Sequence, residues 1–202
     1  ATVNHRKLWD ENMRLFKILV FGILLWSTQT SAANPVVEMK TSVGAIRIEL
    51  YAEKAPKSVA NFLQYVNDGA YAGTQFHRVI PGFMIQGGAF DREFRQKPPR
   101  QPIENEAGNR LKNEMGTVAM ARTPNPHSAT VQFFINVADN AALDFREPSP
   151  AGFGYAVFGK VSAGMDVVMR IARTPTGPGG LFDKDVPQQA VIIESITLIS
   201  DK

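Results

Sequence analysis

The sequence predicts a mainly β protein: one antiparallel β domain, closed or sandwiched, with only two helices. Many short runs rich in β-branched and aromatic residues are separated by turn residues. Only two segments carry the apolar spacing of a helix. At 202 residues the chain is long enough for one domain with a sizeable core, and we find no internal repeat in it. These three observations together favour a β barrel or sandwich.

The first elements after residue 33 are two strands and a helix. Residues 36–40 and 45–50 read as short strands on either side of a turn-like segment. The helix is expected to open around Pro56, because proline costs little in a first helical turn. Gly69 is expected to end it. Its apolar stripe, spaced i, i+3, i+4 and i+7, consists of Val59, Phe62, Leu63 and Val66.

Six more strands and a second helix are predicted along the rest of the chain. Residues 90–113 are rich in proline and charge, which indicates a long solvated excursion. Residues 174–187 are rich in glycine and proline and are expected to form a loop. The second helix is predicted over residues 165–172. The strands are predicted over residues 74–80, 83–87, 116–121, 130–137, 155–161 and 190–199.

The first 33 residues have the pattern of a secretory signal. Met13 begins a basic segment, residues 18–26 are almost all apolar, and Ser31-Ala32-Ala33 offers a cleavage site after Ala32 or Ala33. Nine apolar residues are too few for a span of about 20, so we expect cleavage rather than a retained anchor. Residues 1–12 show no pattern of their own. We therefore expect an upstream segment (1–12), a cleavable signal peptide (13–33) and a periplasmic domain (34–202), if the signal is bacterial.

Composition excludes several classes of protein. Of the formal net charge of +3, residues 1–33 contribute +2, so the remaining domain is nearly neutral and unsuited to nucleic acid. Without cysteine there is no disulfide or thiolate. His77 and His127 are not in metal-ligand spacing, and hydrogen-bonding roles are expected for both. No G-x-S-x-G elbow occurs, which argues against a hydrolase, and no P-loop lysine occurs, which argues against a phosphate-binding loop. We expect no metal and no cofactor.

The most informative segment covers residues 76–88, which read as strand, tight turn, strand. Pro81-Gly82 suits the two middle positions of a type II turn. Around the turn lie Arg78, Gln86 and the apolar pair Phe83-Met84. A fixed cation and an amide beside apolar side chains can recognise a peptide bond next to an apolar ring.

This segment closely resembles the signature of the cyclophilin family of peptidyl-prolyl cis-trans isomerases, particularly the bacterial periplasmic cyclophilins. Residues 117–122 and 132–136 resemble the further strands of the family's groove, and the resemblance extends from Val36 to the C-terminus. It implies an eight-stranded antiparallel closed barrel capped by two helices. It also implies a rotamase that acts on proline-containing polypeptides, without a cofactor, and that assists the folding of exported proteins.

Alternation along the strands predicts which side chains face the groove. Phe76 and Arg78 are expected to share one face, with His77 on the opposite face. Gln132 and Phe134 are expected to face the groove, while the residues between and beyond them pack in the barrel core.

The resemblance implies roles for ten residues. Arg78, the arginine of the motif, is the catalytic candidate and would donate to the prolyl nitrogen of the twisted amide. Gln86 would hold the carbonyl of the residue before proline, and the backbone of Ala121-Arg122 would pair with an extended substrate. The other implied substrate-binding residues are Phe83, Met84, Gln132, Phe134, Leu143 and Tyr155.

The sequence departs from many eukaryotic cyclophilins at two positions. Ala142 stands where they carry a tryptophan beside the groove, and Tyr155 stands where they carry a histidine. The tryptophan position is associated in the family with tight binding of cyclosporin, so we expect weak cyclosporin binding here. The segment 145–153 is also longer than is usual in the family, so the resemblance does not define this wall of the groove.

Two alternatives to an exported isomerase remain open from the sequence. The same groove could serve a proline-binding module or holdase chaperone that needs no turnover, and Arg78 favours the enzyme because a pure binder needs no such cation. The other alternative is an isomerase tethered to the inner membrane by an uncleaved signal. After cleavage we expect a monomer with no stable membrane association.

Overall fold

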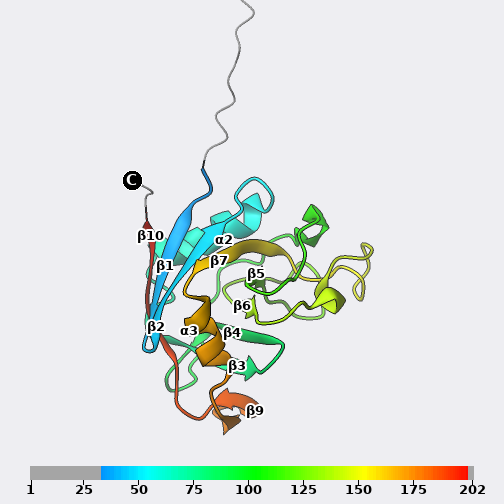
Figure 1. Cartoon of the computed structure of the whole chain (residues 1–202). Helices are drawn as coiled ribbons and strands as arrows, with labels where there is room; N and C mark the ends of the chain where they lie inside the picture. The colour runs from blue at the N-terminus through cyan, green and yellow to red at the C-terminus, as the bar shows by residue number, and fades with distance from the viewer. Residues whose placement is uncertain (1–32, 200–202) are drawn as a thin grey trace, which may run out of the picture. The chain divides into compact units, whose positions relative to one another are not determined.

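The computed structural model of this protein describes residues 33–199 (Figure 1). The segment 1–12 and the signal peptide, apart from Ala33, therefore lie outside the described residues. Within residues 33–199, no helix is both long and apolar enough to cross a membrane.

Eight strands close into an antiparallel barrel, as the resemblance implied. Around the barrel the order is β1-β10-β3-β4-β6-β5-β7-β2, and β2 pairs with β1 to close it. The strands are β1 (Val36–Thr41), β2 (Gly44–Leu50), β3 (Thr74–Ile80), β4 (Met84–Asp91), β5 (Thr117–Met120), β6 (Phe133–Asn136), β7 (Val157–Ala163) and β10 (Ile192–Ile199).

Two helices complete the main core. Helix α2 (Pro56–Asn67) begins at a proline, and Gly69 follows it in a left-handed conformation with φ of 63°. Helix α3 (Met165–Ala172) has the bounds that the sequence predicted. Phe62 of α2 lies among the core aromatic rings, with its centroid 5.2 Å from Tyr71 and 5.7 Å from Phe133. Both helices thus bury their apolar faces against the barrel interior.

Short helical turns and a hairpin occupy the connections. The excursion between β4 and β5 contains the 3-10 turn η1 (Ala107–Asn109), and η2 (Ala141–Leu143) follows β6. Residues 174–187, expected as a loop, instead form the hairpin β8 (Thr176–Gly179) and β9 (Phe182–Pro187). The hairpin packs on the barrel through Phe182, whose ring lies 5.4 Å from that of His77. The glycine and proline content of this segment indicates a loop, because these two strands depend on packing against distant residues and not on local sequence.

A β-bulge in β3 corrects one sequence-based expectation. Phe76 pairs with Gly87 and Arg78 pairs with Gln86, so His77 is an extra residue on this strand. The bulge breaks the alternation, and Phe76 turns into the barrel core, where its ring lies 6.2 Å from Phe133. Phe76 therefore does not share a face with Arg78.

Candidate functional site

A cavity of about 150 Å³ lies on the outer face of the barrel, where β3, β4, β5 and β6 are neighbours. Nine of the ten predicted site residues line it, and Gln132 is the one that does not. The nine are Arg78, Phe83, Met84, Gln86, Ala121, Arg122, Phe134, Leu143 and Tyr155.

The turn between β3 and β4 places the residues at one end of this cavity. Gly82 has φ of 70° and the Phe83 amide donates to the Ile80 carbonyl at 3.1 Å, which is the type II turn predicted for Pro81-Gly82. The turn brings Phe83 and Met84 back beside Arg78. The cation and the apolar wall of the site thus come from one hairpin.

A chain of hydrogen bonds connects the polar side chains of the site. Arg78 Nη1 donates to Gln86 Oε1 at 3.3 Å, and Gln86 Nε2 donates to Gln132 Oε1 at 2.8 Å. Because arginine can only donate, the Gln86 oxygen must face Arg78 and its NH2 group must face Gln132. Gln132 does not line the cavity but belongs to the site through this chain.

The floor of the cavity is a small apolar cluster separate from the barrel core. Met84, Ala119, Phe134 and Val157 are all buried in it. The Phe134 ring meets the Tyr155 ring edge-on, with centroids 5.7 Å apart and planes at 78°. Packing within this cluster therefore fixes the position of the apolar side chains that line the cavity.

Arg122 and Tyr155 form the opposite rim. The Arg122 guanidinium lies over the Tyr155 ring, 4.6 Å from its centroid, and Nε donates to the Gly154 carbonyl at 2.9 Å. The Ala121 amide already donates to the Gln132 carbonyl at 3.0 Å. Any pairing of this segment with a peptide therefore falls on the Ala121 carbonyl and the Arg122 backbone.

His77 is buried beside the site, at the bulge that breaks the alternation on which its expected orientation rested. Its ring centroid lies 4.8 Å from that of Phe90, and its Nδ1 has no hydrogen-bond partner among residues 33–199. Burial is the main cause that lowers the pKa of His77 to about 4, and the nearby charge of Arg78 lowers it further. Hydrogen bonds to the Gln75 carbonyl and to the Gln132 side chain act in the opposite direction. His77 is therefore neutral at neutral pH.

His127 lies in a loop and has a hydrogen-bonding role. Its Nδ1 accepts from the Asn105 amide at 3.1 Å, and its ring meets Phe153 edge-on at 5.0 Å. Within residues 33–199, no group of three or more histidine, cysteine or acidic side chains is arranged to hold a metal ion.

Sequence reasoning did not find the asparagines behind the cavity. Asn140 Nδ2 donates to the Phe83 carbonyl at 2.8 Å, and Asn113 Nδ2 donates to the Leu143 carbonyl at 3.1 Å. Asn136, fully buried at the end of the apolar strand β6, joins them. The one local sign of this group in the sequence is Asn136, a polar residue at the end of an otherwise apolar strand.

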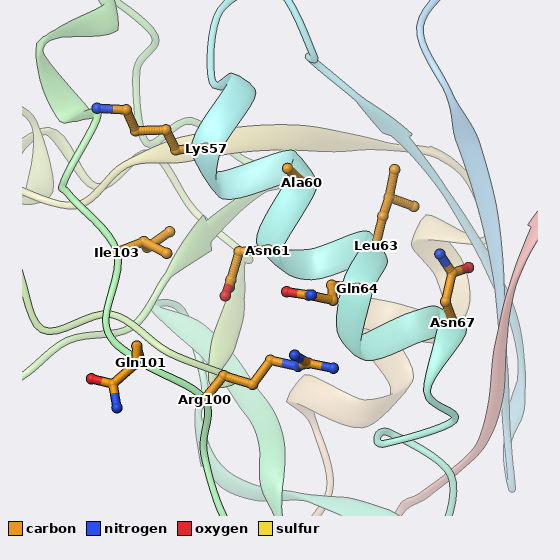
Figure 2. A pocket seen from close by; sticks show the side chains of 9 residues that line it. All are labelled: Lys57, Ala60, Asn61, Leu63, Gln64, Asn67, Arg100, Gln101 and Ile103. Carbon is orange, nitrogen blue, oxygen red and sulfur yellow. The ribbon is translucent and has the colours of Figure 1, made fainter.

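A larger depression of about 620 Å³ lies between α2 and the extended segment that carries Arg100, Gln101 and Ile103 (Figure 2). None of the predicted site residues lines it. Its two basic side chains are already paired, Lys57 with Glu104 and Arg100 with Asp68. It lacks the combination of an apolar enclosure and an available cation that the smaller cavity has.

The smaller cavity suits recognition and polarisation of a bound group without covalent chemistry. Among the described residues, no carboxylate, histidine, serine or threonine side chain lines it, and its one hydroxyl is the phenol of Tyr155. What it offers is an apolar floor, two arginines and the Gln86 amide. These groups fit an apolar ring attached to a peptide bond.

Comparisons with known proteins agree with this chemistry. The family described as cyclophilin type peptidyl-prolyl cis-trans isomerase/CLD matches residues 36–198. A peptidyl-prolyl cis-trans isomerase of Acinetobacter baylyi is 54% identical over 182 residues, covering 90% of this chain and 94% of the relative. Peptidyl-prolyl cis-trans isomerase B of Escherichia coli K12 is 53% identical over 163 residues, covering 81% of this chain and 99% of the relative.

Solved structures of similar proteins extend the comparison. A cyclophilin type peptidyl-prolyl cis-trans isomerase of Cryptosporidium parvum superposes with a TM-score of 0.68 at 26% identity, covering 84% of this chain and 99% of that one. A second crystal structure of the same protein, in the presence of the dipeptide Ala-Pro, gives a TM-score of 0.67 at 26% identity, covering 82% and 99%.

Proposed function

The chain belongs to the cyclophilin-type peptidyl-prolyl cis-trans isomerases, and we propose that it accelerates rotation about Xaa-Pro bonds by stabilising the twisted amide in the 150 Å³ cavity. Amide resonance sets a barrier of about 18–20 kcal/mol for this rotation. Uncatalysed exchange at Xaa-Pro bonds therefore takes tens to hundreds of seconds, which can limit folding. The enzyme must bind the twisted bond more tightly than either planar form.

Arg78 is the group that stabilises the twisted bond. Rotation about the C–N bond removes resonance and leaves a lone pair on the prolyl nitrogen. A guanidinium near that nitrogen donates to the lone pair, which the planar amide does not offer. The single observation that carries this proposal is the position of Arg78, on the lining of an apolar cavity and tied to Gln86 at 3.3 Å.

The amide side chains hold the substrate in register. Gln86 has one N–H donated to Gln132, which leaves its second N–H for the carbonyl of the residue before proline. Phe83, Met84, Phe134 and Leu143 enclose the proline ring. The Ala121 carbonyl and the Arg122 backbone pair with the extended chain, so recognition depends little on neighbouring side chains.

The clients are prolines in unfolded or flexible exported chains, and the protein assists their folding. Support for this comes from a groove that contacts mainly backbone and one ring, and from the signal-like pattern of residues 13–33. Expression in a Gram-negative host with mass spectrometry of the mature chain tests the export. A periplasmic product beginning after Ala32 or Ala33 is expected. An uncleaved chain in the membrane fraction would instead support the tethered isomerase.

Exchange spectroscopy by NMR tests the role of Arg78. An Xaa-Pro peptide is mixed with the parent protein or with Arg78→Ala, at equal concentration. We expect fast cis/trans exchange with the parent and a loss of about 100-fold or more in the variant, the scale seen when one stabilising donor is removed from an active site. Arg170→Ala is the matched control, because Arg170 lies on α3 and donates to the Val43 carbonyl away from the cavity.

The same experiment separates turnover from binding. A holdase or binding module would broaden the peptide signals without accelerating exchange, in parent and variant alike. Accelerated exchange that survives Arg78→Ala would leave the isomerase in place but would refute this role for Arg78.

A further inference from the structure

Three asparagine side chains form a continuous hydrogen-bonded chain behind the proline cavity. Asn140 Nδ2 donates to Asn136 Oδ1 at 2.7 Å, and Asn136 Nδ2 donates to Asn113 Oδ1 at 3.2 Å. The second N–H of Asn136 is donated to Thr117 Oγ1 at 2.9 Å. We call Asn113, Asn136 and Asn140 the asparagine relay.

Asn140 contacts both walls of the cavity. Its Nδ2 donates to the Phe83 carbonyl at 2.8 Å, which also accepts from the Val137 amide at 3.0 Å. The backbone carbonyl of Asn140 accepts from the Leu143 backbone amide at 2.8 Å. Phe83 belongs to the turn between β3 and β4, and Leu143 belongs to η2. Asn140 therefore connects two segments that are 60 positions apart in the sequence.

Asn113 fixes the other end of the relay. Its Nδ2 lies within hydrogen-bonding distance of the Leu143 carbonyl at 3.1 Å and of the Tyr155 carbonyl at 3.3 Å. Its backbone amide donates to Asp144 Oδ1 at 2.8 Å, and its carbonyl accepts from the Asn140 amide at 2.7 Å. Leu143 and Tyr155 both line the cavity. The relay thus reaches three of the cavity's walls through their backbones.

Burying three carboxamide groups costs free energy unless their N–H and C=O groups have hydrogen-bond partners. Asn136 is fully buried and Asn113 is 1% exposed. A buried carboxamide that loses its partners carries a desolvation penalty, whereas a fully connected buried network makes its surroundings rigid. An apolar residue would complete the strand β6 equally well. Three asparagines in one network therefore point to a role in geometry.

We propose that the asparagine relay is a positioning device that holds Phe83 and Leu143 at the separation required by the proline ring, with Asn140 as the end of the relay that contacts both residues. The inference rests on the proposed function of the cavity. The relay does not touch the substrate but acts through the backbones of Phe83 and Leu143. Because those side chains enclose the ring in the planar and the twisted forms alike, the relay contributes uniform binding, which appears in KM rather than kcat.

Two variants of Asn140 in the full chain test the proposal with an Ala-Pro-containing tetrapeptide. Asn140→Asp keeps the size but replaces the NH2 donor with an acceptor, and Asn140→Ala removes the group without adding charge. Asn140 is only partly buried, so both should fold, and thermal unfolding checks this. We expect KM to rise about threefold to tenfold with kcat within about twofold, as for the loss of one or two oriented hydrogen bonds.

The matched control is Asn61→Asp. Asn61 is a buried asparagine of α2 whose Nδ2 donates to the Thr130 carbonyl at 2.6 Å, the same kind of bond without a link to Phe83 or Leu143. It should lower thermal stability and leave KM unchanged. A rise in KM for Asn61→Asp equal to that of the Asn140 variants would show that general loosening is the cause and would overturn the proposal.

A double-mutant cycle separates the relay from the proposed cavity. Because Asn140 acts largely through Phe83, adding Asn140→Asp to Phe83→Ala should raise KM less than it does in the parent. Fully additive effects, or an unchanged KM in folded Asn140 variants, would overturn the relay as a positioning device. If Phe83→Ala itself leaves KM unchanged, the assignment of the cavity fails, and the relay's role fails with it.

Discussion

Arg78 and Gln86 are register partners on β3 and β4, and Arg78 Nη1 donates to Gln86 Oε1 at 3.3 Å. Arginine has five N–H donors, so this bond fixes one edge of the guanidinium and leaves the others available to a substrate. The same bond orients the Gln86 carboxamide with its NH2 group toward Gln132. The position of the cation and the direction of the amide therefore depend on each other.

This dependence predicts that Gln86→Glu will be worse than Gln86→Leu. A glutamate would bind Arg78 as an ion pair and offer the substrate carbonyl no N–H. We expect kcat/KM to fall about 100-fold or more for glutamate, the scale for a lost electrostatic donor. Leucine removes the hydrogen bonds of Gln86 to Arg78, Gln132 and the substrate carbonyl, but it leaves the charge of Arg78 uncompensated and available, so the loss should be smaller, about tenfold. NMR exchange rates measure both, and equal losses would contradict the argument.

Tyr155 should act through its ring rather than its hydroxyl. The ring packs edge-on against Phe134 and lies beneath the Arg122 guanidinium, and Tyr155→Phe preserves both contacts. We expect its kcat/KM to stay within about twofold of the parent. Tyr155→Ala removes an aromatic pair and a cation–π contact and should lower kcat/KM about fivefold to tenfold, mainly through KM. A tenfold loss in Tyr155→Phe would assign a role to the hydroxyl instead.

Features that depend on local sequence were predictable. The type II turn at Pro81-Gly82 follows from the conformations that those two residues favour, and the structure has it. Helix α3 has the predicted bounds because an apolar stripe begins right after Gly164, whose φ is 84°. The nine residues lining the cavity could be named in advance from the family resemblance, and four of them, Arg78, Met84, Gln86 and Phe134, lie on the adjacent strands β3, β4 and β6.

Features that depend on distant contacts were not predictable. The bulge at His77 turns Phe76 inward because the barrel interior accepts its ring beside Phe133, and no local pattern marks that choice. The hairpin β8–β9 is stabilised by packing of Phe182 on His77 and Phe90. The asparagine relay joins β6 to segments before and after it, so single-sequence spacing could not reveal it.

Burial of His77 predicts a decrease in stability on mild acidification. Desolvation lowers its pKa to about 4 in the folded protein, against about 6.5 when unfolded. As the pH falls from 6.5 to 4 the unfolded chain takes up the proton first, so the free energy of unfolding decreases. At 1.36 kcal/mol per pKa unit, the loss is about 3 kcal/mol, and it is absent above pH 7.

Denaturant unfolding of the parent and of His77→Phe, from pH 8 to pH 4, measures this contribution. The variant keeps the aromatic packing against Phe90 and Phe182 but has no proton to bind. Its free energy of unfolding should therefore fall less steeply below pH 6.5, while the acidic residues titrate in both proteins. Parallel curves for the two proteins would mean that His77 does not titrate as described.

Ala142 predicts weak inhibition by cyclosporin. The residue is exposed on η2, next to Leu143 of the cavity, and it offers none of the indole surface associated in the family with tight binding of this drug. We expect half-inhibition of the parent well above the low nanomolar range. Ala142→Trp should improve it by about tenfold or more, because a buried aromatic anchor contributes about 2 kcal/mol at an interface.

Ala141→Trp is the matched control for that gain. It adds the same indole one position earlier on the same exposed 3-10 turn, on a different side of η2. Because its indole lies on that different side, it should leave inhibition unchanged. Both variants gain the same surface hydrophobicity, so a gain seen only in Ala142→Trp must come from the position of the indole. Equal gains in the two variants would show that the indole acts nonspecifically. Low nanomolar inhibition of the parent would mean that the missing tryptophan does not limit drug binding in this groove.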